Sequence, residues 1–173
     1  MNKIFLHGFP LLSLVIGCAG LEPLEMREGI YGKGIPVITR SFASKQLWPG
    51  DTWKVYLMAS DPDGNMKNIF CVMERPGVRY PVGITRIKEK DRKEISGYIY
   101  LTTFADPMAR LNFVNLTLTV QIQDMAGHFS EPAIFPLSIH SRFVQETPPQ
   151  GIFQERDLGP IMIRLPVGGR GKK

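Results

Sequence analysis

The sequence is poor in cysteine and lacks the short motifs that mark most enzyme and cofactor sites. Cys18 and Cys71 are the only cysteines among 173 residues, and no Cys-x-x-Cys pair occurs, which argues against a redox pair, a zinc knuckle or attached haem. No Gly-x-Ser-x-Gly, His-Glu-x-x-His, phosphate-binding glycine loop or dinucleotide fingerprint is present. We therefore expect a protein that is not an enzyme and binds no cofactor at a dedicated motif.

Excess positive charge is also missing from most of the chain, although the formal net charge is +5. Residues 1–17 carry one base, Lys3, and no acid, and residues 158–173 carry four bases and no acid. The 16 bases that remain balance the 16 acids. Bases near the C-terminus are therefore the candidates for contact with an anionic partner. These candidates are Arg170, Lys172 and Lys173.

This distribution of charge predicts no nucleic-acid partner. The most highly charged run, residues 88–94, mixes four bases with three acids and holds no aromatic residue. Nucleic-acid surfaces combine charge of one sign with side chains that stack on bases. The run instead predicts a solvated connection between strands.

The N-terminal segment, residues 1–17, has the features of a secretory signal peptide. Lys3 precedes an apolar run over residues 8–17, which is too short to span a bilayer. The sequence Val15-Ile16-Gly17-Cys18 resembles the lipobox of bacterial lipoproteins, in which the cysteine is acylated and begins the mature chain. The resemblance implies a covalent lipid on Cys18 and hence a membrane anchor. An ordinary cleaved signal and an uncleaved anchor are the alternatives.

The same resemblance predicts where the protein is located. Lipoproteins belong to the bacterial cell envelope, and Ala19 after the cysteine resembles an outer-membrane sorting signal. A surface location in a Gram-positive cell is the alternative. Residues 18–35 are rich in Gly, Pro and Glu, so we expect them to form a tether between the lipid and a folded domain.

Short runs with the pattern of β-strands fill residues 36–140. Apolar and polar residues alternate in 52–60 and 116–123, as in strands that bury one face. Weaker candidates lie at 37–42, 66–74, 78–87, 95–103 and 133–140. The predicted fold class is all-β. We expect an immunoglobulin-like antiparallel β-sandwich of about seven strands, with an extended C-terminal tail over residues 141–173.

Residues 120–132 resemble the last hairpin of fibronectin type III and related bacterial immunoglobulin-like domains. In that hairpin a strand ends in Asn or Asp, Gly follows three residues later, and Ser and Pro lead into the final strand. The matching residues here are Asp124, Gly127, Ser130 and Pro132. Trp53 on an early strand fits the same group. Leu116 stands where the type III family usually has tyrosine, so the resemblance implies the architecture and leaves the subfamily open.

The turn Asp61-Pro62-Asp63-Gly64-Asn65 is the most site-like group in the sequence. Oxygen atoms at alternating positions of a turn can converge on calcium, which makes Asp61, Asp63 and Asn65 candidate ligands. The turn is not an EF-hand, because Met66 stands where that loop requires Gly. A tight turn capped by its own side chains is the alternative, and we favour it.

Two tyrosines are candidate partner contacts. Tyr98 and Tyr100 alternate with apolar residues, so we expect both rings on one face of a sheet. An exposed pair of rings can stack on a sugar or anchor a protein partner, whereas ordinary cross-strand packing is the alternative.

The segment after residue 140 contains the apolar run Ile161–Leu165, which predicts a short strand at an edge of the sandwich or in a partner's sheet. Cys71 lies in an apolar run and is expected to be an unreactive core residue. The whole sequence predicts a non-catalytic envelope lipoprotein that serves as a structural or accessory subunit through protein–protein contacts. The alternatives are a carbohydrate- or peptidoglycan-binding module and a calcium-dependent adhesin.

Overall fold

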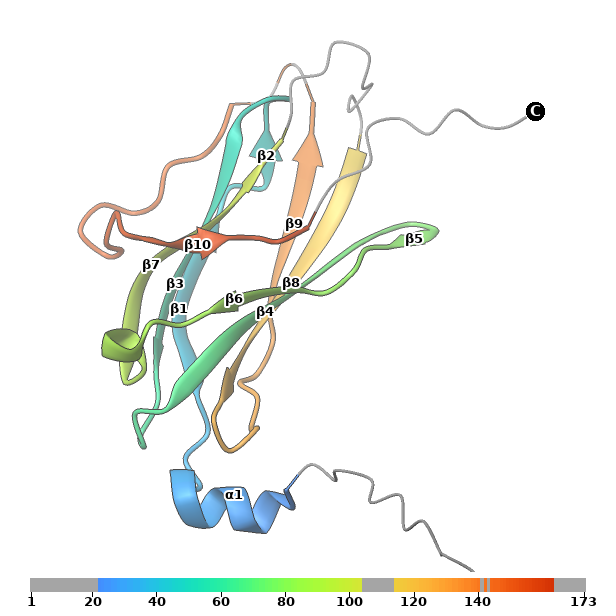
Figure 1. Ribbon diagram of the computed structural model, residues 1–173. Coiled ribbons are helices and arrows are strands. Elements are labelled where there is room, and N and C mark those ends of the chain that lie inside the picture. The colour runs from blue at the N-terminus through green and yellow to red at the C-terminus, as the bar shows by residue number, and fades with distance from the viewer. Residues whose placement is uncertain (1–21, 104–113, 141, 143, 164–173) are drawn as a thin grey trace, which may run out of the picture.

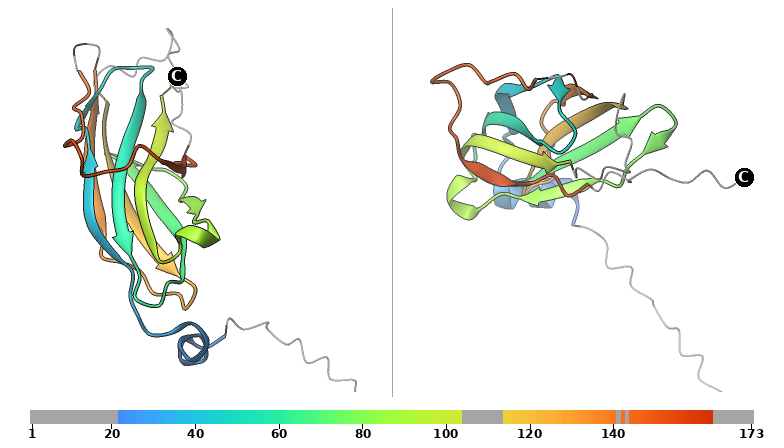
Figure 2. Two further views of the ribbon diagram at one scale, coloured as in Figure 1. Left: turned by 90° about the vertical axis from the view of Figure 1, so that its left-hand side faces the viewer. Right: turned by 90° about the horizontal axis from the view of Figure 1, so that it is seen from above.

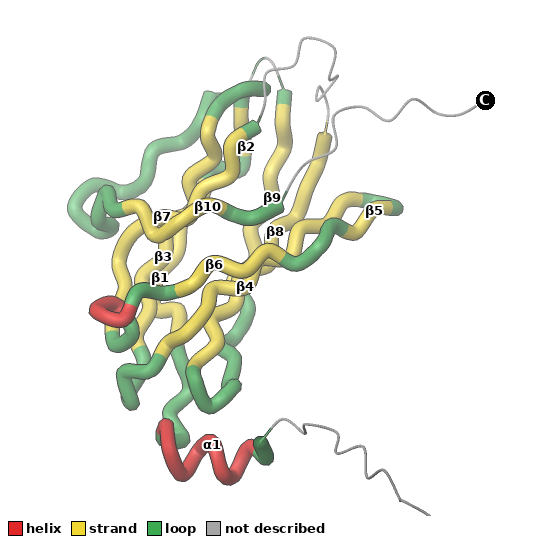
Figure 3. Tube along the Cα trace, in the orientation of Figure 1, coloured by secondary structure: helices red, strands yellow, loops and turns green. Residues whose placement is uncertain are grey.

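Two β-sheets packed face to face form the body of the protein, and one α-helix lies across an end of it (Figure 1). This computed structural model describes residues 22–103, 114–140, 142 and 144–163. Within them, helix is confined to α1 (Leu24–Tyr31) and the 3-10 turn η1 (Glu89–Asp91), and strands make up the rest of the regular structure (Figure 3). The views in Figure 2 show an elongated body with α1 at one end of the strands.

The two sheets divide the strands in the manner of an immunoglobulin-like sandwich. Sheet A has the order β1 (Val37–Ala43), β3 (Thr52–Ser60), β7 (Glu94–Thr102), β10 (Asp157–Pro160). Sheet B has the order β2 (Gln46–Leu47), β9 (Ala133–Ile139), β8 (Val114–Asp124), β4 (Met66–Arg75), β5 (Val78–Arg79), and β6 (Gly83–Arg86) also pairs with β4. The chain passes from one sheet to the other at several connections, among them those from β3 to β4, from β6 to β7 and from β7 to β8, as is typical of this architecture. The predicted fold class is confirmed.

The core lies between the sheets and follows the alternation in the sequence. On β3, Trp53, Val55 and Leu57 are completely buried, and Leu118 and Val120 on β8 are equally buried. The Trp53 indole donates a hydrogen bond from Nε1 to the carbonyl oxygen of Ser44, 2.8 Å away. A buried polar edge on a large apolar ring is thereby satisfied.

Cys71 lies in this core opposite Val120 and is fully buried, as expected. Burial raises the pKa of its thiol to about 12, because the apolar surroundings disfavour the thiolate. The core is therefore held by packing, with Cys71 acting as a small apolar side chain.

The C-terminal segment returns to the sandwich. The strand expected at Ile161–Leu165 lies instead at Asp157–Pro160, where β10 pairs in parallel with β7. Ile161 and Ile163 follow it into the core, with 4% and 6% of their surfaces exposed. The Thr85 hydroxyl of β6 donates to the carbonyl of Pro160 at 2.7 Å. Residues 157–163 thus connect the two sheets along one side.

The segment expected to be a tether differs from that expectation after residue 22. Residues 24–31 form α1 rather than an irregular linker. The sequence does not predict this helix, because its apolar residues show little helical periodicity and Gly29 disfavours a helix. No residue of α1 is buried, which is why no apolar stripe marks it. Tertiary contacts with the end of the sandwich stabilise the helix instead.

Candidate functional site

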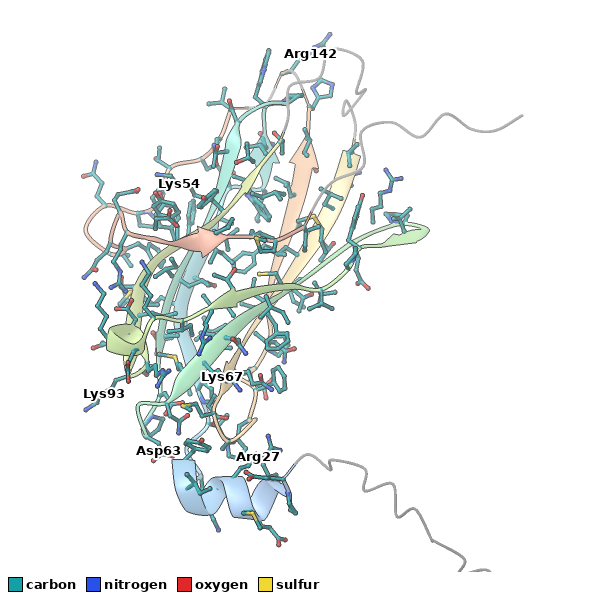
Figure 4. All side chains as sticks on the ribbon, viewed as in Figure 1. Arg27, Lys54, Asp63, Lys67, Lys93 and Arg142 are labelled. Carbon is teal, nitrogen blue, oxygen red and sulfur yellow. The ribbon has the colours of Figure 1, made fainter. Side chains whose placement is uncertain are left out.

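The end of the sandwich beneath α1 gathers the most polar chemistry in the described residues. Two turns meet there: residues 61–65 between β3 and β4, and residues 124–128 at the end of β8. In Figure 4, Asp63 lies next to α1, and Arg27 extends from the helix toward the strands. The sandwich supplies both acidic turns, and α1 supplies a third set of charged side chains.

The calcium candidates make hydrogen bonds to the protein itself. Asp61 Oδ1 accepts the backbone N–H groups of Asp63 at 2.8 Å and Gly64 at 2.9 Å. Asp63 Oδ2 accepts the N–H of Gly34 at 2.6 Å, so this carboxylate faces the segment that follows α1. This pattern is that of a capped turn.

Asn65 bonds in two directions. Its Nδ2 donates to the carbonyl of Tyr31 at the end of α1, and its Oδ1 accepts the N–H of Met125 from the other turn at 3.2 Å. In the described part of the chain, no three or more His, Cys, Asp or Glu side chains are grouped as metal ligands. Calcium binding by Asp61, Asp63 and Asn65 stays the less favoured alternative, and their observed contacts join α1 to the sandwich.

One atom of this turn is unsatisfied. Asp61 is only 2% exposed, and its Oδ2 has no hydrogen-bond partner in the protein. Burial raises the pKa of Asp61, while the backbone N–H groups that bond to it oppose that rise. The buried carboxylate of Asp124 adds to the rise, because two negative charges repel one another.

His128 links the second turn to the helix. Its Nδ1 is 2.8 Å from Asp124 Oδ2, and its Nε2 is 3.0 Å from Glu28 Oε1 of α1. Asp124 is 1% exposed, and its other oxygen accepts the N–H groups of Gly127 and His128. The hydrogen bond that Glu28 accepts, and next the one that Asp124 accepts, raise the pKa of His128, because both carboxylates favour the imidazolium.

This Asp–His–Glu arrangement is chemically a clamp. A general base needs a ring nitrogen free to accept a proton from a nucleophile or substrate. Here each ring nitrogen of His128 faces a carboxylate. An imidazolium that is hydrogen-bonded at both nitrogens can only donate protons and has no lone pair with which to accept one. The sequence could not reveal the clamp, since Glu28 lies 100 residues before His128 in a segment expected to be a tether.

The predicted tyrosine pair lies on the outer face of sheet A. The rings of Tyr98 and Tyr100 are 6.4 Å apart and meet edge to face. Tyr56 from β3 lies 5.6 Å from Tyr98, and Lys54 Nζ lies 4.3 Å from the centre of the Tyr98 ring. Cross-strand packing therefore accounts for much of the surface of these rings.

The segment before β10 crosses this tyrosine face. Phe153 lies 5.6 Å from Tyr56, and Glu155 accepts hydrogen bonds from the Tyr56 hydroxyl at 2.6 Å and from Lys54 at 2.8 Å. Burial and the bond to Glu155 raise the pKa of Tyr56 to about 12. The sequence did not predict these contacts, because Glu155 and Tyr56 are far apart in the chain and nothing local marks them as partners.

A hollow of about 270 Å³ adjoins this face. Two aromatic rings and several polar side chains line it, and part of the lining comes from residues 145–148, which follow β9. The lining residues are Phe42, Thr52, Lys54, Tyr56, Gln145, Glu146, Thr147 and Pro148.

The outer face of sheet B carries a patch of apolar side chains. Register pairs Phe70 with Ile84, and Phe129 meets Phe70 edge to face at 5.3 Å. Ile134 is 61% exposed, Ile84 49% and Phe129 43%. We call this set the sheet B patch; it consists of Phe70, Val72, Ile84, Phe129 and Ile134. Such a patch is unusual on a solvated sheet face and typical of a contact surface.

The other candidate residues lie outside the described part of the chain. They are Cys18, Arg170, Lys172 and Lys173. Among the described residues, no helix has the length and apolar character needed to cross a bilayer.

No protein-family model matches the sequence, and no curated protein matches it either. The structure is similar to the PKD domain of an M14-like peptidase from a Thermoplasmatales archaeon, with 14% identity, a TM-score of 0.38 and coverage of 62% of this chain and 97% of that one. Fibronectin(III)-like modules of Clostridium thermocellum CbhA match with 13% identity, a TM-score of 0.38 and coverage of 68% of this chain and 53% of that one.

A third match is the CARDB domain of a Pyrococcus furiosus protein in complex with di-metal ions. It shares 9% identity at a TM-score of 0.29, over 62% of this chain and 87% of that one. At these scores the assignment of the immunoglobulin-like fold rests on the order of the strands themselves.

Proposed function

We propose that the protein is a non-catalytic lipoprotein of the bacterial cell envelope that serves as an accessory subunit and binds a protein partner through the sheet B patch. Acylation of Cys18 anchors it, and the outer membrane is the proposed membrane. The single observation that carries the proposal of a protein partner is the exposed apolar cluster around Phe70 and Ile134. Aromatic and aliphatic anchors at the centre of a polar surface are the usual energetic core of protein interfaces.

The chemistry around the patch fits a protein rather than a nucleic acid. Thr117, Thr119 and Gln121 of β8 lie on the same face and provide uncharged polar groups. The 16 bases and 16 acids from Cys18 to Asp157 balance, so the domain as a whole carries no net charge that would attract a nucleic acid. Association would therefore depend on apolar contact and shape.

Site-specific photo-crosslinking in native membranes tests the proposal. A photoreactive residue at position 134 is expected to capture a stoichiometric protein partner, whereas the same residue at position 144 is the control. Val144 is 81% exposed and is not part of the patch. Equal or absent crosslinking at both positions would reject the patch as the contact surface.

Matched substitutions give a second measurement. Ile134→Glu is expected to weaken recovery of the partner at least tenfold, since an anchor lost from an interface costs on the order of 2 kcal/mol. Val144→Glu changes an exposed aliphatic residue to the same acid and is expected to leave recovery unchanged. Both variants should melt at the temperature of the unaltered protein, because neither side chain is in the core.

A carbohydrate-binding module is the second candidate function, favoured by the hollow beside Tyr56. Aromatic rings next to polar side chains are suited to sugars. Retention on purified peptidoglycan or glycan without any protein partner, with loss of retention in Phe42→Ala, would support this candidate in place of the first.

A further inference from the structure

Exposed apolar side chains gather at the end of the sandwich that carries α1. Of the twelve large apolar side chains that are exposed in the described residues, five lie between residues 24 and 37. Their exposed fractions range from 45% to 63%. They are Leu24, Met26, Ile30, Ile35 and Val37.

The two sides of α1 differ in character. Glu28 bonds to His128, and Arg27 packs against Gly127, so these residues face the sandwich. Met26 and Ile30 are separated by about one helical turn and lie on the side away from those contacts. With exposed fractions of 56% and 63%, they are the most exposed apolar residues of the helix.

The short distance along the chain from α1 to Cys18 indicates what covers the side of the helix that carries Met26 and Ile30. Glu22, the first described residue, is four residues after Cys18. Four residues span at most about 14 Å, even when fully extended. A lipid on Cys18 would place α1 close to the headgroups of the bilayer, where apolar side chains on one side of a helix are buried favourably.

We propose that α1 lies on the surface of the lipid bilayer, with Met26 and Ile30 inserted among the headgroups, and that the sandwich stands on this helix. The inference rests on the proposed lipid at Cys18. Because α1 lies across the end of the strands (Figures 1 and 2), a helix parallel to the bilayer directs the strands away from it. The sheet B patch then faces sideways, toward a neighbour in the same membrane.

The clamp and two further hydrogen bonds fix the orientation of α1 relative to the sandwich. Glu28 accepts from His128, the Tyr31 carbonyl accepts from Asn65, and the Gly34 N–H donates to Asp63, so successive parts of residues 28–34 are connected to both turns of the sandwich. A flexible tether would leave the domain free to tumble around its lipid. Three attachments along seven residues hold the helix and the sandwich as one unit.

Depth-dependent quenching on full-length acylated protein tests the inference. Met26→Cys and Ile30→Cys, each labelled with an NBD fluorophore, are reconstituted in vesicles of phosphatidylethanolamine and phosphatidylglycerol that contain a nitroxide-labelled lipid. Cys71 is buried and its thiol pKa is about 12, so it does not compete for the label. The control is Arg142→Cys, at the opposite end of the molecule from Arg27 (Figure 4).

We expect several-fold more quenching at residues 26 and 30 than at residue 142. Acylated, vesicle-bound protein with equal quenching at the three positions would overturn the inference and leave the anchor intact. Palmitate-analogue labelling of the same preparation reports on the anchor separately. Equal labelling of the unaltered chain and Cys18→Ala would overturn the proposed anchor and this inference together.

Discussion

His128 and Glu28, 100 residues apart in the chain, approach to 3.0 Å and attach the N-terminal helix to the end of the sandwich. Asp124 holds the other nitrogen of the ring, so the imidazole bridges two carboxylates from different elements. The attachment depends on a proton, because only the imidazolium can donate to both.

This relationship predicts that docking of α1 weakens as the pH rises. The pKa of His128 is raised in the folded protein, so its stabilising contribution is full below the unfolded pKa of about 6.5 and is lost as the pH passes through the folded value. Glu28 and Asp124 accept hydrogen bonds from the His128 ring. Of the other charged groups nearby, Lys33 lies 3.9 Å from Glu28 and Arg27 packs against Gly127. The Asp61 carboxylate interacts with that of Asp124. None of these changes the sign of the effect.

Amide hydrogen exchange over residues 22–34 measures how firmly α1 is docked at each pH. Unaltered protein and His128→Asn are compared at the same pH, so that the intrinsic exchange rate cancels. At pH 5.5 the unaltered protein should be better protected, by on the order of 1 kcal/mol, and the difference should shrink toward pH 9. A difference that stays constant with pH would contradict a role for the imidazolium.

A glycine in β7 controls the path of the C-terminal segment. A Cβ atom at Gly97 would lie 2.4 Å from the carbonyl oxygen of Arg156, and that oxygen accepts the N–H of Tyr98 at 2.8 Å. Gly97→Ala is expected to displace residues 156–158 and to break the 2.8 Å ion pair between Arg156 and Asp91. The cost should be about 1–3 kcal/mol, as for other overpacked sites.

Urea unfolding of Gly97→Ala measures this cost, with Gly29→Ala as the matched control. A Cβ at Gly29 in α1 meets no atom within 4 Å, and alanine favours a helix, so that variant should be neutral or slightly more stable. Equal unfolding midpoints for the two variants would show that residues 156–158 tolerate displacement without cost.

Cys71 should be inert in the native protein. It is fully buried, and its thiol pKa of about 12 leaves almost no thiolate at neutral pH. We expect no reaction with a maleimide or a disulfide reagent at pH 7.5, and rapid reaction after denaturation. Fast native labelling, measured by mass spectrometry, would contradict the packing of the core around β4.

How much the sequence predicts depends on the range over which each signal acts. The alternation of Trp53, Val55 and Leu57 predicts which face of β3 is buried, because a strand's period is a local property. The turn at Asp61 is equally local, and its backbone hydrogen bonds match the expectation of a capped turn. Fold class follows from many such local signals.

The clamp and the C-terminal strand depend on contacts between distant segments. Glu28 acquires its role from His128, and Gly159 in β10 fits against Thr85 only because the chain returns to the sandwich. Tyr56 is buried on the outward side of β3 for the same reason, since Phe153 and Glu155 cover it. No spacing in the sequence encodes these pairings, so a tether is expected where the structure has the docked helix α1, and the edge strand is expected at residues 161–165 instead of 157–160.

The basic C-terminus gives the last prediction. All four bases after Asp157 lie beyond Ile163, which is the last buried residue in the part of the chain that the structure describes, and the chain from Cys18 to Asp157 has no net charge. Deleting residues 164–173 should therefore remove the salt-sensitive part of membrane or partner binding while leaving the melting temperature unchanged.

Deleting residues 158–173 serves as a comparison, because it also removes Ile161 and Ile163. The loss of two buried side chains of this size should lower the free energy of unfolding by at least about 4 kcal/mol. Vesicle co-sedimentation at low and high salt, together with thermal unfolding of both truncations, separates the two effects. Salt dependence that survives the shorter deletion would locate the attraction in the domain, against the balance of its charges.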